Sequence, residues 1–297
     1  GYETVLCGRM HFSGIDQRHG FEKRLVGDMN ASYGGGKSVD RIRSPKESSN
    51  SFYAASNAGT GDSTSLRFDR SVTDAACRFL EERDDDRPLM MVAGFFQPHH
   101  PFTAPEEFAE RARKRLEEHD SGLVTAESEH PVVKAHIAKR AKDAPAPEQV
   151  FEARVNYAAM VDYLDTMIGQ VLETAERELD GPVVVIYTSD HGDMLGDHGL
   201  WGKTVAHEPS IGVPLIISSL RSRDMSMLGI QEGAVVNTPT SLLDVAPTVA
   251  ALAGAPELPG VDGWDLSPVL RGESDRSGMW QDRPVFTELC IRFPGSG

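Results

Sequence analysis

Short apolar runs rich in β-branched residues alternate along this chain with longer segments in which apolar residues recur every three or four positions. The runs are typical of buried strands, and the periodic segments are typical of amphipathic helices. Residues 105–143 are highly charged and indicate helix broken at Pro131, and residues 30–65, rich in Ser, Gly and Asn, indicate a loop. The predicted strands are residues 2–8, 89–96, 183–189, 212–219 and 283–289, and the predicted helices are residues 69–82, 148–179 and 240–254.

This alternation predicts an α/β protein with a mostly parallel sheet flanked by helices. Gly181 and Pro182 end the long helix before the next strand, and Gly254 follows the last predicted helix as its C-cap. A length of 297 residues suits one large domain or two smaller ones, and we favour a single domain over residues 1–297.

The formal charge of −15 argues against non-specific binding to nucleic acid or anionic membranes, because like charges repel. The sequence contains no apolar run of about 18 residues, the length that a membrane span needs. Cys7, Cys77 and Cys290 match neither a disulfide framework nor a zinc motif, so we expect reduced thiols. Because the chain opens directly on a predicted strand, we expect sequence before Gly1, where a signal peptide would lie. A cytoplasmic location is slightly favoured, and self-association stays open.

Three predicted strands end in unusual polar residues. The first is followed by Arg9 and His11, the second by the segment "QPHHP", and the third by Asp190 and His191. Because ligands bind beyond the carboxyl ends of parallel strands, we expect these loops to converge on one pocket.

Asp190 and His191 stand in a tight loop before Gly192, where both side chains can turn toward one cation. A carboxylate and an imidazole suit Ca²⁺ or Mg²⁺, or Mn²⁺ or Zn²⁺ if more nitrogen ligands join them. The alternative is a capping aspartate beside a surface histidine. Lys203, after "GLWG", would neutralise an anionic substrate or is a solvated lysine. Asp193, Asp197 and His198 are expected to be loop and capping residues.

The "PHHP" segment holds His99 and His100 between prolines that restrict the backbone, so one ring can be aimed as a general acid. Arg9 and His11, one residue apart, share a face if the exit segment is extended; Arg9 would then bind an anion and His11 act as a base. A surface pair is the alternative. Together the cations, imidazoles and expected metal suggest a pocket for a small tetrahedral oxyanion ester. Neither a GxxxxGK[ST] phosphate loop nor a GxSxG elbow is present.

These segments resemble the sulfatase family of the alkaline-phosphatase-like superfamily, and choline-sulfatase-type members in particular. "GRMHFSGIDQRHGFEKRL" is similar to the family's GK-x-H region, and "FFQPHHPFTAP" to its PHxP segment. "YAAMVDYLDTMIGQVLE" resembles the helix before the metal strand, and "TSDHGDMLGDHGLWGK" the family signature. "VPLIIS" and "DVAPTVAALAG…LPGVDGWDLSPVL" follow in the family's order.

The resemblance implies a metal-dependent sulfuric ester hydrolase that acts on a small sulfate monoester. Asp190 and His191 would be metal ligands, most often to Ca²⁺, with Mg²⁺ or Mn²⁺ as alternatives. Lys203 and His99 would contact the sulfate and assist the leaving group, and His11 would assist the nucleophile. Arg9 stands where the family usually has lysine, and Gly212 where many members have arginine.

The family nucleophile is a formylglycine made from a C/S-x-P/A-x-R motif, which Cys7, Cys77 and Cys290 do not fit. The N-terminal aspartates that complete the family's metal site and a C-terminal subdomain are also absent. We therefore expect a sulfatase domain cut at both ends that is inactive alone and holds metal weakly.

Two other functions stay open: a phosphoester or phosphonate hydrolase of the same superfamily, and a non-catalytic binding module. Choline as the substrate alcohol would want an aromatic cage, to which Trp201, Phe95, Phe96 and Phe102 could contribute.

Overall fold

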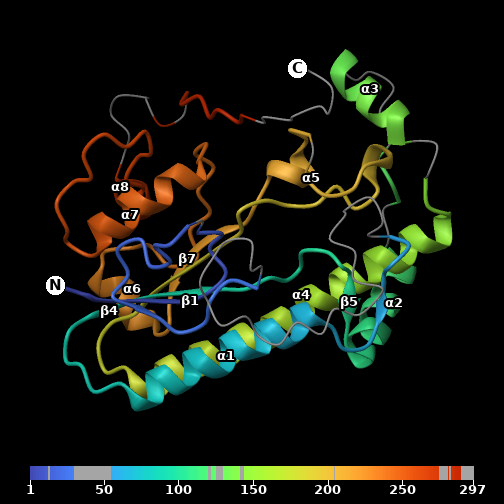
Figure 1. Ribbon diagram of the computed structural model, residues 1–297. Helices are drawn as coiled ribbons and strands as arrows, with labels where there is room; N and C mark the ends of the chain where they lie inside the picture. The colour runs from blue at the N-terminus through green and yellow to red at the C-terminus, as the bar shows by residue number, and fades with distance from the viewer. Residues whose placement is uncertain are drawn as a thin grey trace. The chain divides into compact units, whose positions relative to one another are not determined.

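The computed structural model describes residues 1–12, 14–29, 55–119, 122–124, 130–140, 144–203, 205–273, 280 and 282–288. The chain divides into two compact units (Figure 1). Unit 1 comprises Gly1–Glu178 with Asp193–Gly202, and unit 2 comprises Leu179–Gly192 with Lys203–Gly297. Most of the loop predicted at residues 30–65, namely residues 30–54, lies outside the described residues.

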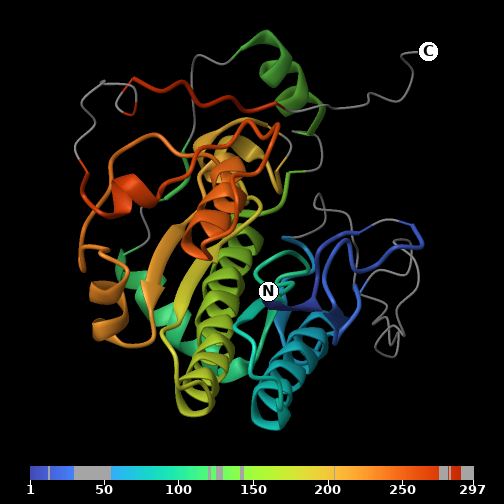
Figure 2. The ribbon, with the colours of Figure 1, turned by 90° about the vertical axis from the view of Figure 1, so that its left-hand side faces the viewer.

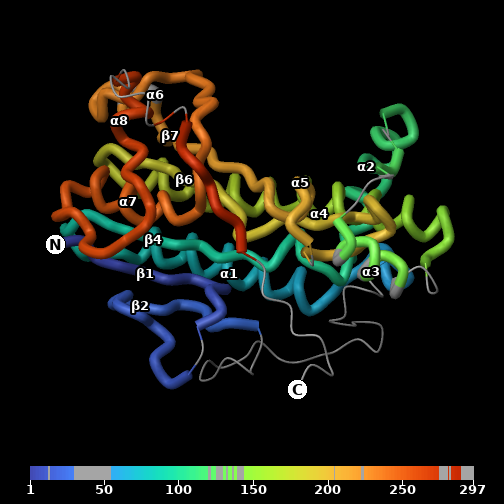
Figure 3. Tube along the Cα trace, turned by 90° about the horizontal axis from the view of Figure 1, so that it is seen from above, coloured from blue at the N-terminus to red at the C-terminus, as the bar shows by residue number. Residues whose placement is uncertain are grey.

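Unit 1 contains a three-stranded parallel sheet in the order β2–β1–β4. Its strands are Lys23–Arg24 (β2), Glu3–Gly8 (β1) and Leu89–Gly94 (β4), and Figure 3 shows them side by side. Strands β1 and β4 pair along their whole length. Both were predicted from their apolar runs and are confirmed, whereas β2 is too short to produce a recognisable pattern.

Helix α1 (Thr64–Glu82) contacts both β1 and β4 and packs along α4 (Pro147–Glu178), as Figure 2 shows. It begins earlier than the predicted start at residue 69. The side chain of Ser63 accepts a hydrogen bond from the backbone N–H of Leu66 at 3.2 Å and so caps the helix. A Ser/Thr-rich stretch that resembles a loop in composition is therefore the beginning of a helix.

Unit 1 has two hydrophobic clusters. One, which includes Cys7, Phe68, Val72 and Ala76, packs α1 against the sheet. The other packs α4 against α2 (Glu106–His119) and against residues 102–104. Pro131 stands at the first position of α3, where the absence of its N–H costs no hydrogen bond. The remaining elements of unit 1 are the parallel strands β3 (Gly59–Thr60) and β5 (Thr103–Ala104), α3 (Pro131–Arg140) and the short 3₁₀-helix η4 (Asp197–Gly199).

Unit 2 is built on strands β6 (Val184–Thr188) and β7 (Leu215–Ser219). Both were predicted, but they pair antiparallel, unlike the parallel strands of unit 1. The helix predicted at residues 240–254 is confirmed, although its first turn is a 3₁₀-helix. The other elements are α5 (Glu208–Ile211), α6 (Ser222–Met227), η5 (Leu242–Asp244), α7 (Val245–Leu252) and α8 (Ser267–Leu270).

The strand predicted at residues 283–289 is wrong: residues 283–288 form no strand, and residue 289 lies outside the described residues. Arg283 instead makes two hydrogen bonds of 2.7 Å to the carboxylate of Asp244, and both side chains are buried. Its guanidinium also lies over the ring of Trp264, 4.3 Å from the centroid. Among the described residues of this segment, the buried side chain of Arg283 thus provides contacts to the fold where a strand ladder had been predicted.

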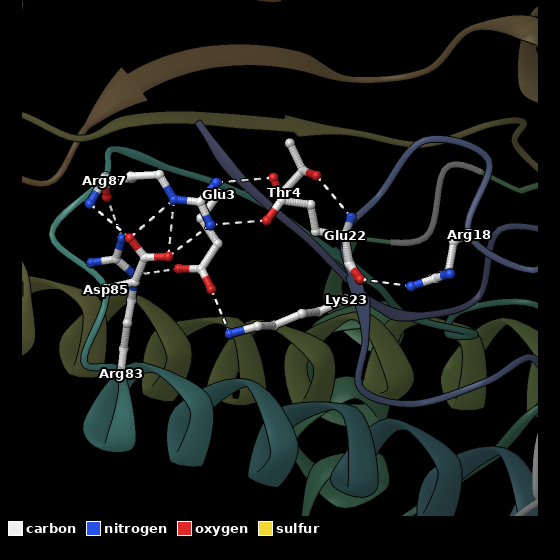
Figure 4. A network of polar contacts seen from close by, with 8 residues as sticks. All are labelled: Glu3, Thr4, Arg18, Glu22, Lys23, Arg83, Asp85 and Arg87. Carbon is white, nitrogen blue, oxygen red and sulfur yellow. Dashed lines mark hydrogen bonds and ion pairs between the residues drawn. The ribbon is translucent and has the colours of Figure 1, made fainter. Parts of the chain in front are cut away.

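A polar network joins the start of β1 to β2 and to the end of α1 (Figure 4). Glu3 at its centre is fully buried. Its carboxylate accepts from Nζ of Lys23 at 2.6 Å and from Nε of Arg83 at 2.8 Å. A charge inside a sheet is tolerable only when it is paired in this way.

Among the described residues, no helix combines the length and the apolar character that a bilayer crossing requires.

Candidate active site

The ends of β1 and β4 lie beside each other in unit 1 and bring Arg9 next to the 95–101 loop. The backbone N–H of Arg9 donates to the carbonyl oxygen of Gly94 at 2.8 Å. A Cβ atom on Gly94 would lie 2.1 Å from the carbonyl oxygen of Arg9. The two strand ends therefore approach this closely because β4 ends in glycine.

Arg9 and His11 contact each other through their side chains. Nε of Arg9 donates to Nε2 of His11 at 3.1 Å, and Nη2 of Arg9 lies 2.5 Å from the same nitrogen. A guanidinium only donates, so Nε2 of His11 carries the lone pair and the neutral ring carries its proton on Nδ1. His11 thus has at Nε2 the acceptor that a base requires, and Arg9 covers it.

Asp28 fixes the position of His11. Its Oδ2 accepts from the backbone N–H of His11 at 3.0 Å and lies 3.6 Å from Nδ1 of the same residue. The backbone of His11 has a φ of 53°, a left-handed conformation that costs a non-glycine residue about 1 kcal/mol. The exit segment is therefore not extended at His11, which was the condition for Arg9 and His11 to share a face. The buried Asp28 carboxylate helps to hold this left-handed conformation.

The ring of Phe96 contacts both Arg9 and His99. The guanidinium of Arg9 lies 4.3 Å from the ring centroid, and the ring of His99 lies 4.9 Å from it in an edge-on arrangement. His99 is partly exposed, whereas His100 is buried. The structure thus places Arg9 and His99 against one aromatic ring, and His11 against Arg9.

The tautomer of His99 limits what it can do. Its Nδ1 lies 2.8 Å from the carbonyl oxygen of His100, which only accepts, so the proton of the neutral ring is on Nδ1. His99 can therefore donate a proton from Nε2 only as an imidazolium.

Asp190, His191 and Lys203 form a second group, in unit 2, beyond the end of β6. Nδ1 of His191 donates to the carbonyl oxygen of Gly192 at 2.8 Å, which leaves the lone pair on Nε2. Nζ of Lys203 donates to this Nε2. Oδ2 of Asp190 lies 3.5 Å from the same nitrogen.

This second group has the chemistry of a partial metal site. A carboxylate oxygen and an unprotonated ring nitrogen are both acceptors, and a positive charge beside them favours their close approach. Lys203 supplies that charge, and a divalent cation suits the same two atoms because Nδ1 of His191 already donates to a backbone carbonyl. Within the part of the chain that the structure describes, no three His, Cys, Asp or Glu side chains are grouped to bind a metal. Asp190 and His191 therefore fit as two ligands of an incomplete set.

Two other acidic residues of the signature segment are loop residues, as predicted: Asp193 organises the loop of that segment, and Asp197 connects it to Val124. Oδ1 of Asp193 accepts from the backbone N–H groups of Leu195 at 3.0 Å and Gly202 at 2.9 Å. Oδ1 of Asp197 accepts from the backbone N–H of Val124 at 3.0 Å.

The aromatic residues considered for a choline cage do not form one. Phe102 is fully buried, Trp201 is 6% exposed, and both belong to the hydrophobic core of unit 1. Phe95 and Phe96 pack partly against the other core cluster of that unit. Besides this packing, the ring of Phe96 contacts Arg9 and His99.

The six residues predicted from the sequence thus occur as two groups of three, one in each unit. The sequence analysis missed three residues that adjoin the first group: Asp28, Phe96 and Asp69. The carboxylate of Asp69 accepts from the backbone N–H groups of Phe96 and Gln97. Only the β4 run before Phe96 hinted at any of them, because a ligand site is expected at the end of a parallel strand.

The Sulfatase family profile matches residues 1–255 of the chain. The choline-sulfatase of Rhizobium meliloti (strain 1021) is 33% identical over 291 residues, which cover 92% of this chain and 54% of that protein. The chain thus spans about half the length of this curated relative, and less of others that it matches.

Two solved structures resemble the chain. The phosphonate monoester hydrolase SpPMH from Silicibacter pomeroyi has a TM-score of 0.64 at 21% identity, covering 93% of this chain and 60% of that one. BT1596, a 2-O GAG sulfatase, has a TM-score of 0.59 at 19% identity, covering 93% and 55%. At these identities the two likenesses show a shared α/β fold, and that alone.

Proposed function

This chain belongs to the sulfatase family, and from that premise we propose that the protein hydrolyses a small sulfate monoester. The proposal rests on the types of side chain that the two groups contain. Arg9, His11 and His99 stand together in one, and Asp190, His191 and Lys203 in the other. They supply the cations, proton carriers and metal ligands that cleavage of an anionic ester requires.

Arg9 and Lys203 would bind the sulfate. A sulfate monoester is negatively charged on its non-bridging oxygens, and fixed cations stabilise charge that develops there. Arg9 offers a planar fork of donors whose orientation is held by Phe96 and His11. Lys203 offers a compact ammonium, one of whose contacts in the structure is Nε2 of His191.

The two histidines would carry protons. His99, as an imidazolium, gives a proton from Nε2 to the departing alcohol, since an alkoxide leaves poorly near neutral pH. His11 accepts a proton at Nε2 from the nucleophile or its ester once substrate has drawn Arg9 away from it.

Asp190 and His191 would hold a divalent metal, for which we propose Ca²⁺, with Mg²⁺ or Mn²⁺ as alternatives. When bound, the metal would add positive charge to the site and act as a Lewis acid on the sulfate. Because these residues are two ligands of an incomplete set, we expect this chain to hold the metal weakly.

The chain by itself is proposed not to turn over sulfate esters, because none of its cysteines lies in the motif that yields formylglycine. Cys7 is no substitute nucleophile. It is fully buried, and burial raises the pKa of its thiol to about 12, so it is not a thiolate at neutral pH.

The test compares this chain with the complete reading frame that contains it. Choline-O-sulfate, an aryl sulfate, an aryl phosphate and an aryl phosphonate monoester are assayed with added Ca²⁺. We expect the complete protein to give its highest kcat/KM on a sulfate, and the chain to be inactive. A higher kcat/KM on the phosphonate or the phosphate would indicate instead a phosphoester or phosphonate hydrolase of the same superfamily. Inactivity on all four, with metal bound, would indicate a binding module.

Replacing Asp28 with asparagine is expected to lower kcat of the complete protein about 10-fold. Asparagine still accepts from the backbone of His11, but it loses the negative charge that lies 3.6 Å from Nδ1. The loss is modest because that distance is too long for a hydrogen bond. Steady-state kinetics measure it.

The matched control for this prediction is Asp16→Asn. Asp16 also accepts from two backbone N–H groups, those of Arg18 and His19, in the same segment of unit 1, but it contacts none of the proposed catalytic side chains. Equal kcat values for Asp28→Asn and Asp16→Asn would remove Asp28 from the site.

A further inference from the structure

Asp69, in the second turn of α1, is a fully buried carboxylate with no part in the chemistry described so far. Its two oxygens accept hydrogen bonds from consecutive backbone N–H groups, that of Phe96 at 2.6 Å and that of Gln97 at 2.9 Å. Such a pair of charge-assisted bonds fixes the backbone more firmly than neutral partners would.

These two N–H groups belong to the point where the chain leaves β4. Beyond Gly94 the strand ladder with β1 has ended, and buried N–H groups there need another acceptor. Asp69 provides it from a neighbouring helix. The same turn is closed by the backbone N–H of His99, which donates to the carbonyl oxygen of Phe96 at 3.1 Å.

Phe96 therefore lies at the junction of two sets of contacts. Its backbone is held by Asp69 and His99, and its ring contacts the Arg9 guanidinium and the His99 imidazole. A displacement of this one residue would move the proposed proton donor and one of the proposed sulfate-binding cations together.

Burial of the Asp69 carboxylate carries a cost in folding free energy. Burial raises the pKa of Asp69 to about 6, although its backbone hydrogen bonds and the charge of Arg9 act to lower it. An apolar residue could fill the same space without the free-energy cost of burying a carboxylate. We infer that this cost is offset by the two hydrogen bonds, which fix the backbone of Phe96 and Gln97.

We propose that Asp69 is a positioning residue: through the backbone of Phe96 and Gln97 it sets where His99 and Arg9 stand. Its importance for turnover rests on the function proposed above, whereas its effect on His99 can be measured without turnover.

The test variant is Asp69→Asn, which keeps the shape but offers one acceptor where the loop needs two. In the chain itself, proton NMR of the His99 Cε1–H reports the ring current of Phe96. We expect this resonance to move toward its value in an unstructured peptide. In the complete protein we expect kcat to fall about 10²-fold, as for a misplaced catalytic group, with KM changing by less than about threefold.

The matched control is Asp244→Asn. Asp244 is also fully buried and also accepts from two backbone N–H groups, those of Ser241 and Trp264, but it belongs to unit 2 and contacts none of the six proposed residues. It should lower stability while the His99 resonance and kcat stay as in the unmodified protein. An unchanged His99 resonance in Asp69→Asn would overturn the proposal.

If Asp69→Asn does not fold, Phe96→Leu replaces it, because it keeps both backbone bonds and removes the ring that transmits their effect. Because the His99 and Arg9 resonances shift in this variant with the loss of the ring itself, the readout is kcat of the complete protein, and an unchanged kcat in Phe96→Leu would overturn the proposal. If the complete protein cleaves no sulfate ester, the proposed function fails, and the His99 resonance still decides whether Asp69 positions that residue.

Discussion

Replacing Lys203 with alanine is expected to lower kcat/KM of the complete protein for its sulfate ester by about 10²- to 10³-fold. Loss of one preorganised donor to a developing oxyanion costs about 2.7–4 kcal/mol of barrier. In the structure the Lys203 ammonium lies beside Nε2 of His191, one of the two proposed metal ligands. Its removal takes away a positive charge and leaves Asp190 and His191 as two facing acceptors.

Three measurements separate this effect from a folding defect. The melting temperature should change little, because Lys203 is partly exposed and belongs to no core cluster. Lys203→Arg should recover part of the activity, since it keeps the charge but not the shape. Lys114→Ala, the same change on the exposed face of α2, should leave kcat/KM unaltered. A loss of less than about tenfold in Lys203→Ala would exclude Lys203 from sulfate binding.

Replacing Glu3 with glutamine is expected to lower the free energy of unfolding of this chain by about 3 kcal/mol. Removing one partner of a buried ion pair costs about 3–5 kcal/mol, because the remaining charge stays buried without compensation. The side chain of Arg83 is 12% exposed and suffers this penalty, whereas that of Lys23 is 48% exposed and can turn to water. The lower end of the range is therefore expected, measured by urea unfolding.

The stability lost in Glu3→Gln should depend on pH. Burial alone would raise the pKa of Glu3, but the hydrogen bonds and charges of Lys23 and Arg83 outweigh it and hold the pKa below the ordinary value of 4.5. The difference between the two proteins should therefore be complete above about pH 4.5 and shrink as the pH falls through the lowered pKa.

The control for Glu3 is Glu22→Gln, which removes an exposed partner of Arg87 from the same network (Figure 4). Surface ion pairs are screened by water, so its effect should be much smaller than that of Glu3→Gln. Equal effects of the two changes would show that burial does not set the importance of Glu3.

The strands of the fold were predictable where a short run rich in apolar residues stands between polar segments, as in β1, β4 and β6. Two-residue strands such as β2 depend on a neighbour for their ladder and leave no pattern of their own. The segment after Arg283 contains β-branched and aromatic residues, yet a buried guanidinium holds it in place of a strand partner. Such a tertiary contact does not appear in local periodicity.

The candidate site was predictable to the same extent. Arg9, His99 and Asp190 follow predicted strands, and the rule for parallel sheets gives their placement a reason. Asp28 accepts from the backbone of His11, 17 positions away, and Asp69 from that of Phe96, 27 positions away. Contacts over such separations are visible only in the folded structure. The turn at His11 was missed for a related reason, because its left-handed backbone is supported by a hydrogen bond to Asp28, 17 positions along the chain.

The pairing of Arg283 with Asp244 bears on how this chain can be shortened for laboratory work. Any version that ends before Arg283 would leave the Asp244 carboxylate enclosed without its counterion, between η5 and α7. Trimming the tail should therefore stop short of this arginine, and protease-resistant fragments of unit 2 are expected to retain it.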